Sequence, residues 1–128
     1  TEASTTALDQ LVTLLKENPH VTIELSAHCD YKGNSEYNKH LSQRRAQSVV
    51  DYLIKHGIEK ERLTPVGYGK EKPKNVRKKL TVKYPWLKEG DVLNEEFILK
   101  QSKEHQEICN HLNRRTEFKV LRTTYKLF

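Results

Sequence analysis

The strongest constraint on the fold is an abrupt change in the spacing of apolar residues near the start of the chain. From Leu8 to Leu15 they recur at helical spacing on one face, and Asn18-Pro19 ends that helix. From Val21 to Ala27 they alternate with polar residues, which is typical of a strand that buries one face. A helix followed directly by such a strand predicts a sheet with helices packed on it.

The rest of the chain continues this alternation. A second helix is expected from about Ser35 to His56, because Gly57 is a good residue to follow its end. Three further elements are expected: a short strand at Leu63–Val66 that Pro65 confines to a sheet edge, a helix from the N-cap Asn94 to about Leu112, and a last strand at 117–122. This order predicts an α/β (α+β) sandwich, a small mixed β-sheet with helices packed on it.

Such a sheet would take a further N-terminal strand before the first helix, for which Thr1 leaves no room. We therefore interpret the chain as a fragment that lacks this strand and any upstream targeting or membrane-attachment region. Residues 1–128 are expected to be a single domain with a basic, Pro- and Lys-rich insertion at about 74–93. Its apolar residues should pack onto the domain edge: Leu80, Val82, Tyr84, Trp86 and Leu87.

Composition narrows the function classes. No apolar run approaches the ~20 residues that cross a bilayer. The net charge of +6 suggests a nucleic acid or an anionic surface as partner. All of the excess lies between Lys70 and Lys83, so a nucleic-acid- or protein-docking role for that stretch is kept as the alternative. No nucleic acid partner is expected, because no RNP, helix-turn-helix or zinc-finger pattern is present.

Polar residues interrupt the apolar face of the second helix. With Leu41 set at zero and about 100° per residue, Arg45 falls near ~40°, Asn38 near ~60° and Ser42 near ~100°. These angles lie within the apolar arc, whereas Arg44, near ~300°, points to solvent. We therefore expect Arg45 on the inward side of the helix, where a guanidinium needs a partner or a ligand.

Asp30 is the nearest carboxylate, because it follows the end of the preceding strand, where open α/β sheets tend to bind ligands. A carboxylate and a guanidinium at the same end of a sheet suit a zwitterionic ligand. Its ammonium would bind Asp30 and its carboxylate would bind Arg45. The alternative is that the two residues pair with each other and fix the loop to the helix.

A longer pattern of spaced residues bears on this choice. It consists of Ile23 to Asp30, Gly33, Asn38, Leu41-Ser42, Arg45-Ala46, Val49, Leu53, Gly57-Ile58, Arg62, Gly67-Tyr68-Gly69, Pro73 and Asn113-Arg114-Arg115. These residues cover most of residues 8–73 and 105–121. The pattern resembles the signature of OmpA-like C-terminal domains, which is roughly I-x-I-x-G-H-T-D, G and N-x-x-L-S-x-x-R-A-x-x-V, with a closing N-R-R before a strand.

The resemblance implies non-covalent peptidoglycan binding in the periplasm of a diderm bacterium, by a module that is not an enzyme and needs no cofactor. Such a module anchors an outer-membrane or periplasmic assembly to the cell wall. In this family the Asp of H-T-D and the Arg of L-S-x-x-R-A grip the diaminopimelate of the stem peptide, which implies these roles for Asp30 and Arg45. The family's Asn corresponds to Asn38, and its closing arginines to Arg114 and Arg115.

The sequence departs from the pattern at two positions, where Ala27 replaces Gly and Cys29 replaces the Thr beside the ligand-binding Asp. Arg114 and Arg115 are compatible with a carboxylate clamp or with a merely charged strand start. A fainter likeness of Trp86–Asp91 and Thr123–Tyr125 is to OmpA-family proteins of type IX secretion machinery, which implies protein partners in an envelope complex.

Other chemistries have weaker support. A metal site at His28, Cys29, Asp30 and His40 is disfavoured, because Cys29 alternates in direction with its two neighbours and no second cluster has ligand spacing. A Cys29 nucleophile would lack an oxyanion motif. Cys29 and Cys109 match no metal or redox spacing and form one disulfide or none.

Overall fold

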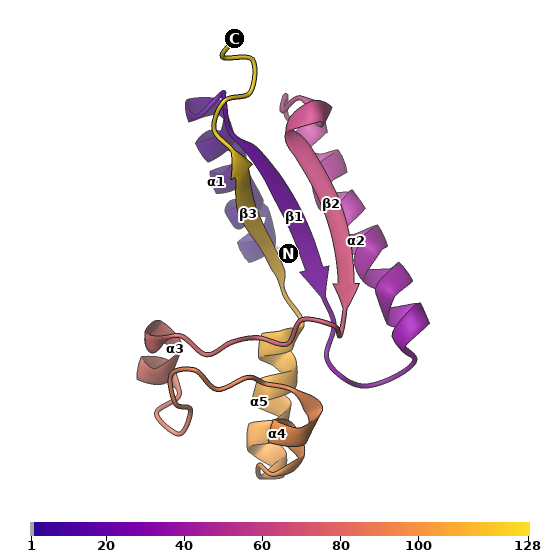
Figure 1. Cartoon of the computed structure of the whole chain (residues 1–128), viewed down its shortest axis with the longest axis vertical. Helices are drawn as coiled ribbons and strands as arrows, with labels where there is room; N and C mark the ends of the chain where they lie inside the picture. The colour runs from indigo at the N-terminus through magenta and orange to yellow at the C-terminus, as the bar shows by residue number, and fades with distance from the viewer. Residues whose placement is uncertain (1) are drawn as a thin grey trace.

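The computed structural model describes residues 2–128, with side chains from residue 5 onward. Its centre is a three-stranded mixed sheet in the order β2-β1-β3. The middle strand β1 (Thr22–His28) pairs in parallel with β2 (Leu63–Gly69) and antiparallel with β3 (Thr116–Arg122). Helices α1 (Glu2–Glu17) and α2 (Ser35–Lys55) lie side by side on one face of this sheet (Figure 1). The predicted fold class is confirmed. Thr1, from which the sequence analysis expected a missing N-terminal strand, lies outside the described residues.

The main core lies between the sheet and the two helices. Successive residues of β1 point to opposite faces, and Ile23, Leu25 and Ala27 on the helix side are at most 2% exposed. Apolar residues of α1, α2 and β2 pack against them: Leu11, Val12, Leu15, Val50, Leu53 and Leu63. The alternation in the sequence therefore predicted the strand and the face that packs on the helices. It did not predict that Thr22, Ser26 and His28 on the other face are buried as well.

Several element boundaries follow from local chemistry. The Asn34 side chain caps α2 by accepting a hydrogen bond from the Tyr37 N–H, and the helix ends before Gly57, whose φ is +99°. Strand β2 is longer than predicted, but Pro65 does lie on an edge strand. A short 3₁₀ helix, η1 (Lys60–Arg62), leads into β2.

Residues 70–94 form a long connection with one short helix, α3 (Lys78–Lys83). Its apolar residues build a second core with the elements that follow: Val76, Leu87 and Leu93 join Ile98 and Cys109, with Tyr84 and Trp86 partly buried beside them. The expectation that Val82 also packs is wrong, because its side chain is 80% exposed on the outer side of α3. No helix within the described residues is long and apolar enough to cross a membrane.

The helix predicted from Asn94 to Leu112 is two helices, α4 (Glu95–Leu99) and α5 (Lys103–Asn113). Asn94 is the N-cap of α4, as predicted, but Ser102 starts a new helix by accepting a hydrogen bond from the His105 N–H at 3.1 Å. Ile98 of α4 and Cys109 of α5 are both fully buried.

The contact between α2 and β2 is unusually close at Gly67. A Cβ atom on this residue would lie 2.1 Å from the backbone nitrogen of Gln43 and 2.5 Å from its Cα. The Gln43 side chain accepts a hydrogen bond from the Gly67 N–H at 2.8 Å, and Ser42 Oγ accepts one from the Gly69 N–H at 2.9 Å. Two helix side chains thus satisfy backbone donors of an edge strand.

Gly67→Ala should lower the free energy of unfolding by about 3 kcal/mol or more, because the methyl group meets helix backbone that cannot move alone. Urea unfolding measures the loss. Gly90→Ala is the matched control: Gly90 has φ +93° but no atom within 4 Å of an added Cβ. It should cost only about 1 kcal/mol of backbone strain. Equal losses in the two variants would contradict the close-contact explanation.

Candidate functional site

Asp30 lies just beyond the C-terminal end of β1. The parallel strands β1 and β2 end side by side here, and this end of the sheet is called the mouth. Its side chain is only 14% exposed. One carboxylate oxygen accepts a hydrogen bond from the Lys32 N–H at 2.9 Å, and the other accepts one from Arg114 Nη1 at 2.7 Å. The carboxylate is therefore held in a fixed position by its own loop and by the end of α5.

Arg114 is the ion-pair partner of Asp30, so the alternative in which Asp30 pairs with Arg45 is wrong. Arg114 follows the last residue of α5 and also donates to Glu107 Oε1 at 2.9 Å. These two hydrogen bonds, to Glu107 and to Asp30, raise the pKa of the Arg114 guanidinium. Arg114 therefore ties Asp30 to α5.

Arg45 is exposed, so the expectation that it lies on the inward side of α2 is wrong. The buried row of α2 runs from Asn38 through Ser42 to Leu53. The centre of this row lies ~80° around the helix from Arg45 and ~180° from Arg44. Because α2 contacts the sheet along one narrow row, a side chain at its border already reaches solvent. The two arginines still differ, since Arg44 is on the opposite side.

The charge of Arg45 acts at the mouth, although its side chain is exposed. Burial raises the pKa of the Cys29 thiol, and the nearby positive charge of Arg45 opposes this effect. Among the described residues, Arg45 makes no ion pair or hydrogen bond with a carboxylate. The Arg45 guanidinium is therefore close enough for its charge to act on the residue that precedes Asp30.

The loop that carries Asp30 is braced from two sides. The Asn38 amide donates a hydrogen bond to the Lys32 carbonyl at 2.8 Å from within α2. From the other side, the Lys70 ammonium donates to the carbonyls of Tyr31 and Gly33, each at 3.0 Å. Asn38 thus acts on the loop, and Lys70 is a brace that the sequence did not single out, because it is one lysine in a basic run.

Cys29 turns its thiol toward α2. The Sγ atom donates to the Asn38 carbonyl at 3.4 Å, and the Cys29 N–H donates to the Gly69 carbonyl at 2.8 Å. Cys29 and Cys109 are both free and buried, so the two thiols form no disulfide. Cys29 therefore links the end of β1 to α2 and to β2 from within the core.

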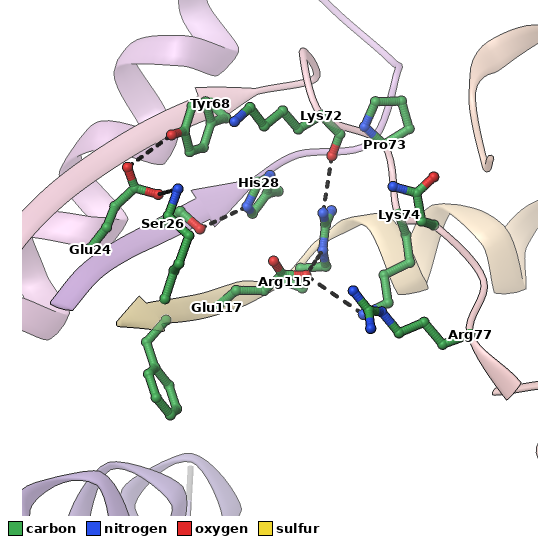
Figure 2. A pocket seen from close by; sticks show the side chains of 13 residues that line it. Glu24, Ser26, His28, Tyr68, Lys72, Pro73, Lys74, Arg77, Arg115 and Glu117 are labelled. Carbon is green, nitrogen blue, oxygen red and sulfur yellow. Dashed lines mark hydrogen bonds and ion pairs between the residues drawn. The ribbon is translucent and has the colours of Figure 1, made fainter. Parts of the chain in front are cut away.

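Arg115 does not pair with Asp30 but lies beside Glu117 (Figure 2). Its guanidinium donates to Glu117 Oε1 at 2.6 Å, to the Lys72 carbonyl at 3.0 Å and to the Asn113 carbonyl at 3.2 Å. Adjacent residues at a strand start point in opposite directions. The sequence left Arg114 and Arg115 as either a carboxylate clamp or a charged strand start. In the structure the two arginines pair with different carboxylates, and only Arg114 contacts Asp30.

Comparison with known proteins shows the family of this chain. Residues 1–84, more than half of the chain, match the OmpA family. The chain belongs to the OmpA family. A peptidoglycan-associated lipoprotein of Rhizobium meliloti is 39% identical over 66 residues, which are 52% of this chain and 38% of the relative. Outer membrane porin F of Pseudomonas fluorescens is 40% identical over 63 residues, 49% of this chain and 19% of the porin. The matches thus span less than half of either relative.

Solved structures share the fold of this OmpA-family chain. The peptidoglycan-associated lipoprotein from Burkholderia pseudomallei superimposes with a TM-score of 0.61 at 21% identity, over 94% of this chain and 78% of the other. The cell wall anchor of the type VI secretion system from Pseudomonas aeruginosa gives 0.60 at 21% identity, over 94% and 67%. These likenesses cover β3 and α5, which lie beyond the family match.

His28, directly before the mouth, belongs to the face of the sheet that α1 and α2 leave open. Its side chain accepts from or donates to Ser26 Oγ at 2.9 Å and stacks on Tyr68 with ring centroids 5.4 Å apart. Burial, together with the charges of Arg115 and Lys72, lowers the pKa of His28 from 6.5 to about 4. Among the side chains that the structure describes, from residue 5 onward, no three His, Cys, Asp or Glu form a group suited to a metal ion.

The lowered pKa of His28 predicts a pH-dependent stability. Between pH 6.5 and about 4 the unfolded chain binds a proton at His28 that the folded chain does not. Stability should therefore fall as the pH drops through this window, by about 2–3 kcal/mol. Urea unfolding of the wild type and His28→Gln at several pH values measures this contribution. Identical pH profiles of the two proteins would contradict the prediction.

Proposed function

We propose that this chain binds peptidoglycan non-covalently and anchors an envelope assembly to the cell wall. Relatives in its family support the proposal, because several of the similar proteins are named peptidoglycan-associated lipoproteins and one solved neighbour is a cell wall anchor. The chain would act in the periplasm, close to the outer membrane. Its role is that of a binding module and not of an enzyme.

The finer proposal is that the ligand is the zwitterionic end of diaminopimelate in the stem peptide. One observation carries it: Asp30 is fixed at the mouth while Arg45, near its neighbour Cys29, has no carboxylate partner among the described residues. A ligand carboxylate would meet Arg45, and the ammonium on the same carbon would meet Asp30.

Asp30 can bind the ammonium without releasing Arg114. A carboxylate has about four acceptor sites, and the Lys32 N–H and Arg114 use two of them. An ammonium at a free site would share the carboxylate with the guanidinium. Arg114, Asn38, Lys70 and Cys29 then act by holding Asp30 and its loop in position, at distances between 2.7 and 3.4 Å.

The predicted affinity of a single site is moderate. Each charge-assisted hydrogen bond contributes about 1.5–3 kcal/mol net. Firm anchoring would then come from several copies bound to one sacculus, because linked sites raise the effective concentration of the second contact. Protein partners of an envelope complex, including the type IX secretion machinery that the sequence suggested, would supply that multiplicity.

Asp30→Asn and Arg45→Ala should each weaken binding to purified sacculi by about 10- to 150-fold, since each removes one charged contact. Asparagine retains an acceptor for the Lys32 N–H, so the loop should stay folded. Co-sedimentation with sacculi measures binding, and free diaminopimelate should compete with it.

Arg44→Ala is the matched control, because it removes the same charge one residue away on the far side of α2. It should bind almost as the wild type does. If Arg44→Ala and Arg45→Ala lost binding equally, a diffuse charge effect would replace the proposed site. Undiminished binding by folded Asp30→Asn and Arg45→Ala would reject the site itself.

The basic stretch from Lys70 to Lys83 is the alternative docking region, but three of its lysines interact with different parts of the molecule. Lys70 braces the Asp30 loop, Lys72 lies over the Tyr68 ring at 4.1 Å, and Lys74 pairs with Glu117 at 3.6 Å. This division weakens the nucleic-acid alternative. Sacculus binding should persist at physiological salt, whereas DNA binding with a steep salt dependence and no wall binding would favour the alternative.

A further inference from the structure

A second pocket lies on the open face of the sheet, away from α1 and α2 (Figure 2). It has a volume of about 260 Å³. The outward row of β1 forms its floor, and the segment after β2 forms one wall. Ser26 and His28 on this floor are only 6% and 3% exposed, although no helix covers them. The pocket is thus a recess with a polar floor, on a face distinct from the Asp30 mouth.

The charges around the pocket are unequal. Its lining contains five cations and two carboxylates: Lys72, Lys74, Arg77, Arg115 and Lys119, with Glu24 and Glu117. Glu117 is engaged by Arg115 at 2.6 Å and by Lys74 at 3.6 Å. These positive charges lower the pKa of Glu117 against the opposing effect of burial, so it stays ionised and neutralises only part of the charge around it.

Two of the three remaining cations, Lys72 and Arg77, have no acidic partner among the described residues. Glu24 accepts a hydrogen bond from the Tyr68 hydroxyl at 3.0 Å and lies 3.9 Å from the Lys119 ammonium. Among the described residues, Lys72 and Arg77 make no ion pair, and Figure 2 shows both at the rim of the pocket. Cations gathered around a recess without matching acids favour the entry of an anion.

Two features make the recess suitable for a specific group. The Arg115 guanidinium is held by three acceptors, so part of the site is formed before any ligand arrives. On the floor, the Nδ1 atom of His28 is buried and has no hydrogen-bond partner. The small volume favours a compact group over a flat membrane surface or a long duplex.

We propose that this pocket binds a compact anionic group, a carboxylate or a phosphate carried by a soluble ligand. Lys72 and Arg77 supply positive charges that no carboxylate neutralises, and Lys74 and Arg115 supply oriented donors beside them. This site is independent of the diaminopimelate site, because it lies on another face and uses none of the residues proposed there.

The test is a titration of the full chain with inorganic phosphate and, separately, with glutarate, followed by amide NMR at constant ionic strength. Saturable shifts should appear at Ser26, Lys74, Arg115 and Glu117 with at least one probe. Saturation by phosphate alone assigns a phosphoryl ligand, and saturation by glutarate alone assigns a carboxylate ligand. Shifts that stay linear with both probes would overturn the proposal.

Matched double variants separate the pocket from general basicity. Lys72→Gln/Arg77→Gln removes two exposed charges at the pocket rim and should weaken probe binding at least about tenfold. Lys78→Gln/Lys79→Gln removes two exposed charges on α3, outside the pocket lining, and should leave binding unchanged. Equal weakening in both variants would overturn the proposal in favour of diffuse attraction. Neither variant alters the Asp30 mouth, so sacculus binding reports on that site separately.

Discussion

The bare backbone of Gly67 allows α2 to lie directly against β2, and the geometry of the mouth depends on this contact. An added Cβ would come within 2.1 Å of helix backbone, so any side chain here would push the helix away. The same helix carries Asn38, which braces the Asp30 loop, and Arg45, whose charge reaches Cys29. A shift of α2 would therefore change the distance between the two charges proposed to hold the ligand.

The central strand β1 divides the molecule into two chemical environments. Its inward row closes the core against α1 and α2, and its outward row forms the polar floor of the second pocket. Because the strand ends at the mouth, one element supports both proposed sites. The adjacent residues Arg114 and Arg115 are divided between the two proposed sites in the same way. Arg114 pairs with Asp30 at the mouth, and Arg115 pairs with Glu117 in the second pocket.

The second core explains how residues 70–94 keep a defined position although their apolar residues follow no helical or strand periodicity. Val76, Leu87 and Leu93 are buried against Ile98 of α4 and Cys109 of α5. This cluster fixes the end of α5, from which Arg114 reaches Asp30. A long connection that looks like an insertion in the sequence thus contributes to the position of the candidate site.

The sequence by itself determined the fold class, the face of β1 that packs on the helices and the edge position of Pro65, because spacing and proline chemistry act locally. It also distinguished Arg45 from Arg44, because the angle between them is set by the helix alone. Tertiary structure decided the rest: the ion pair of Asp30 with Arg114 joins residues 84 positions apart, and no local pattern encodes it. Whether Arg45 is buried depended on how narrowly α2 contacts the sheet, and that width is set by the packing of the whole domain.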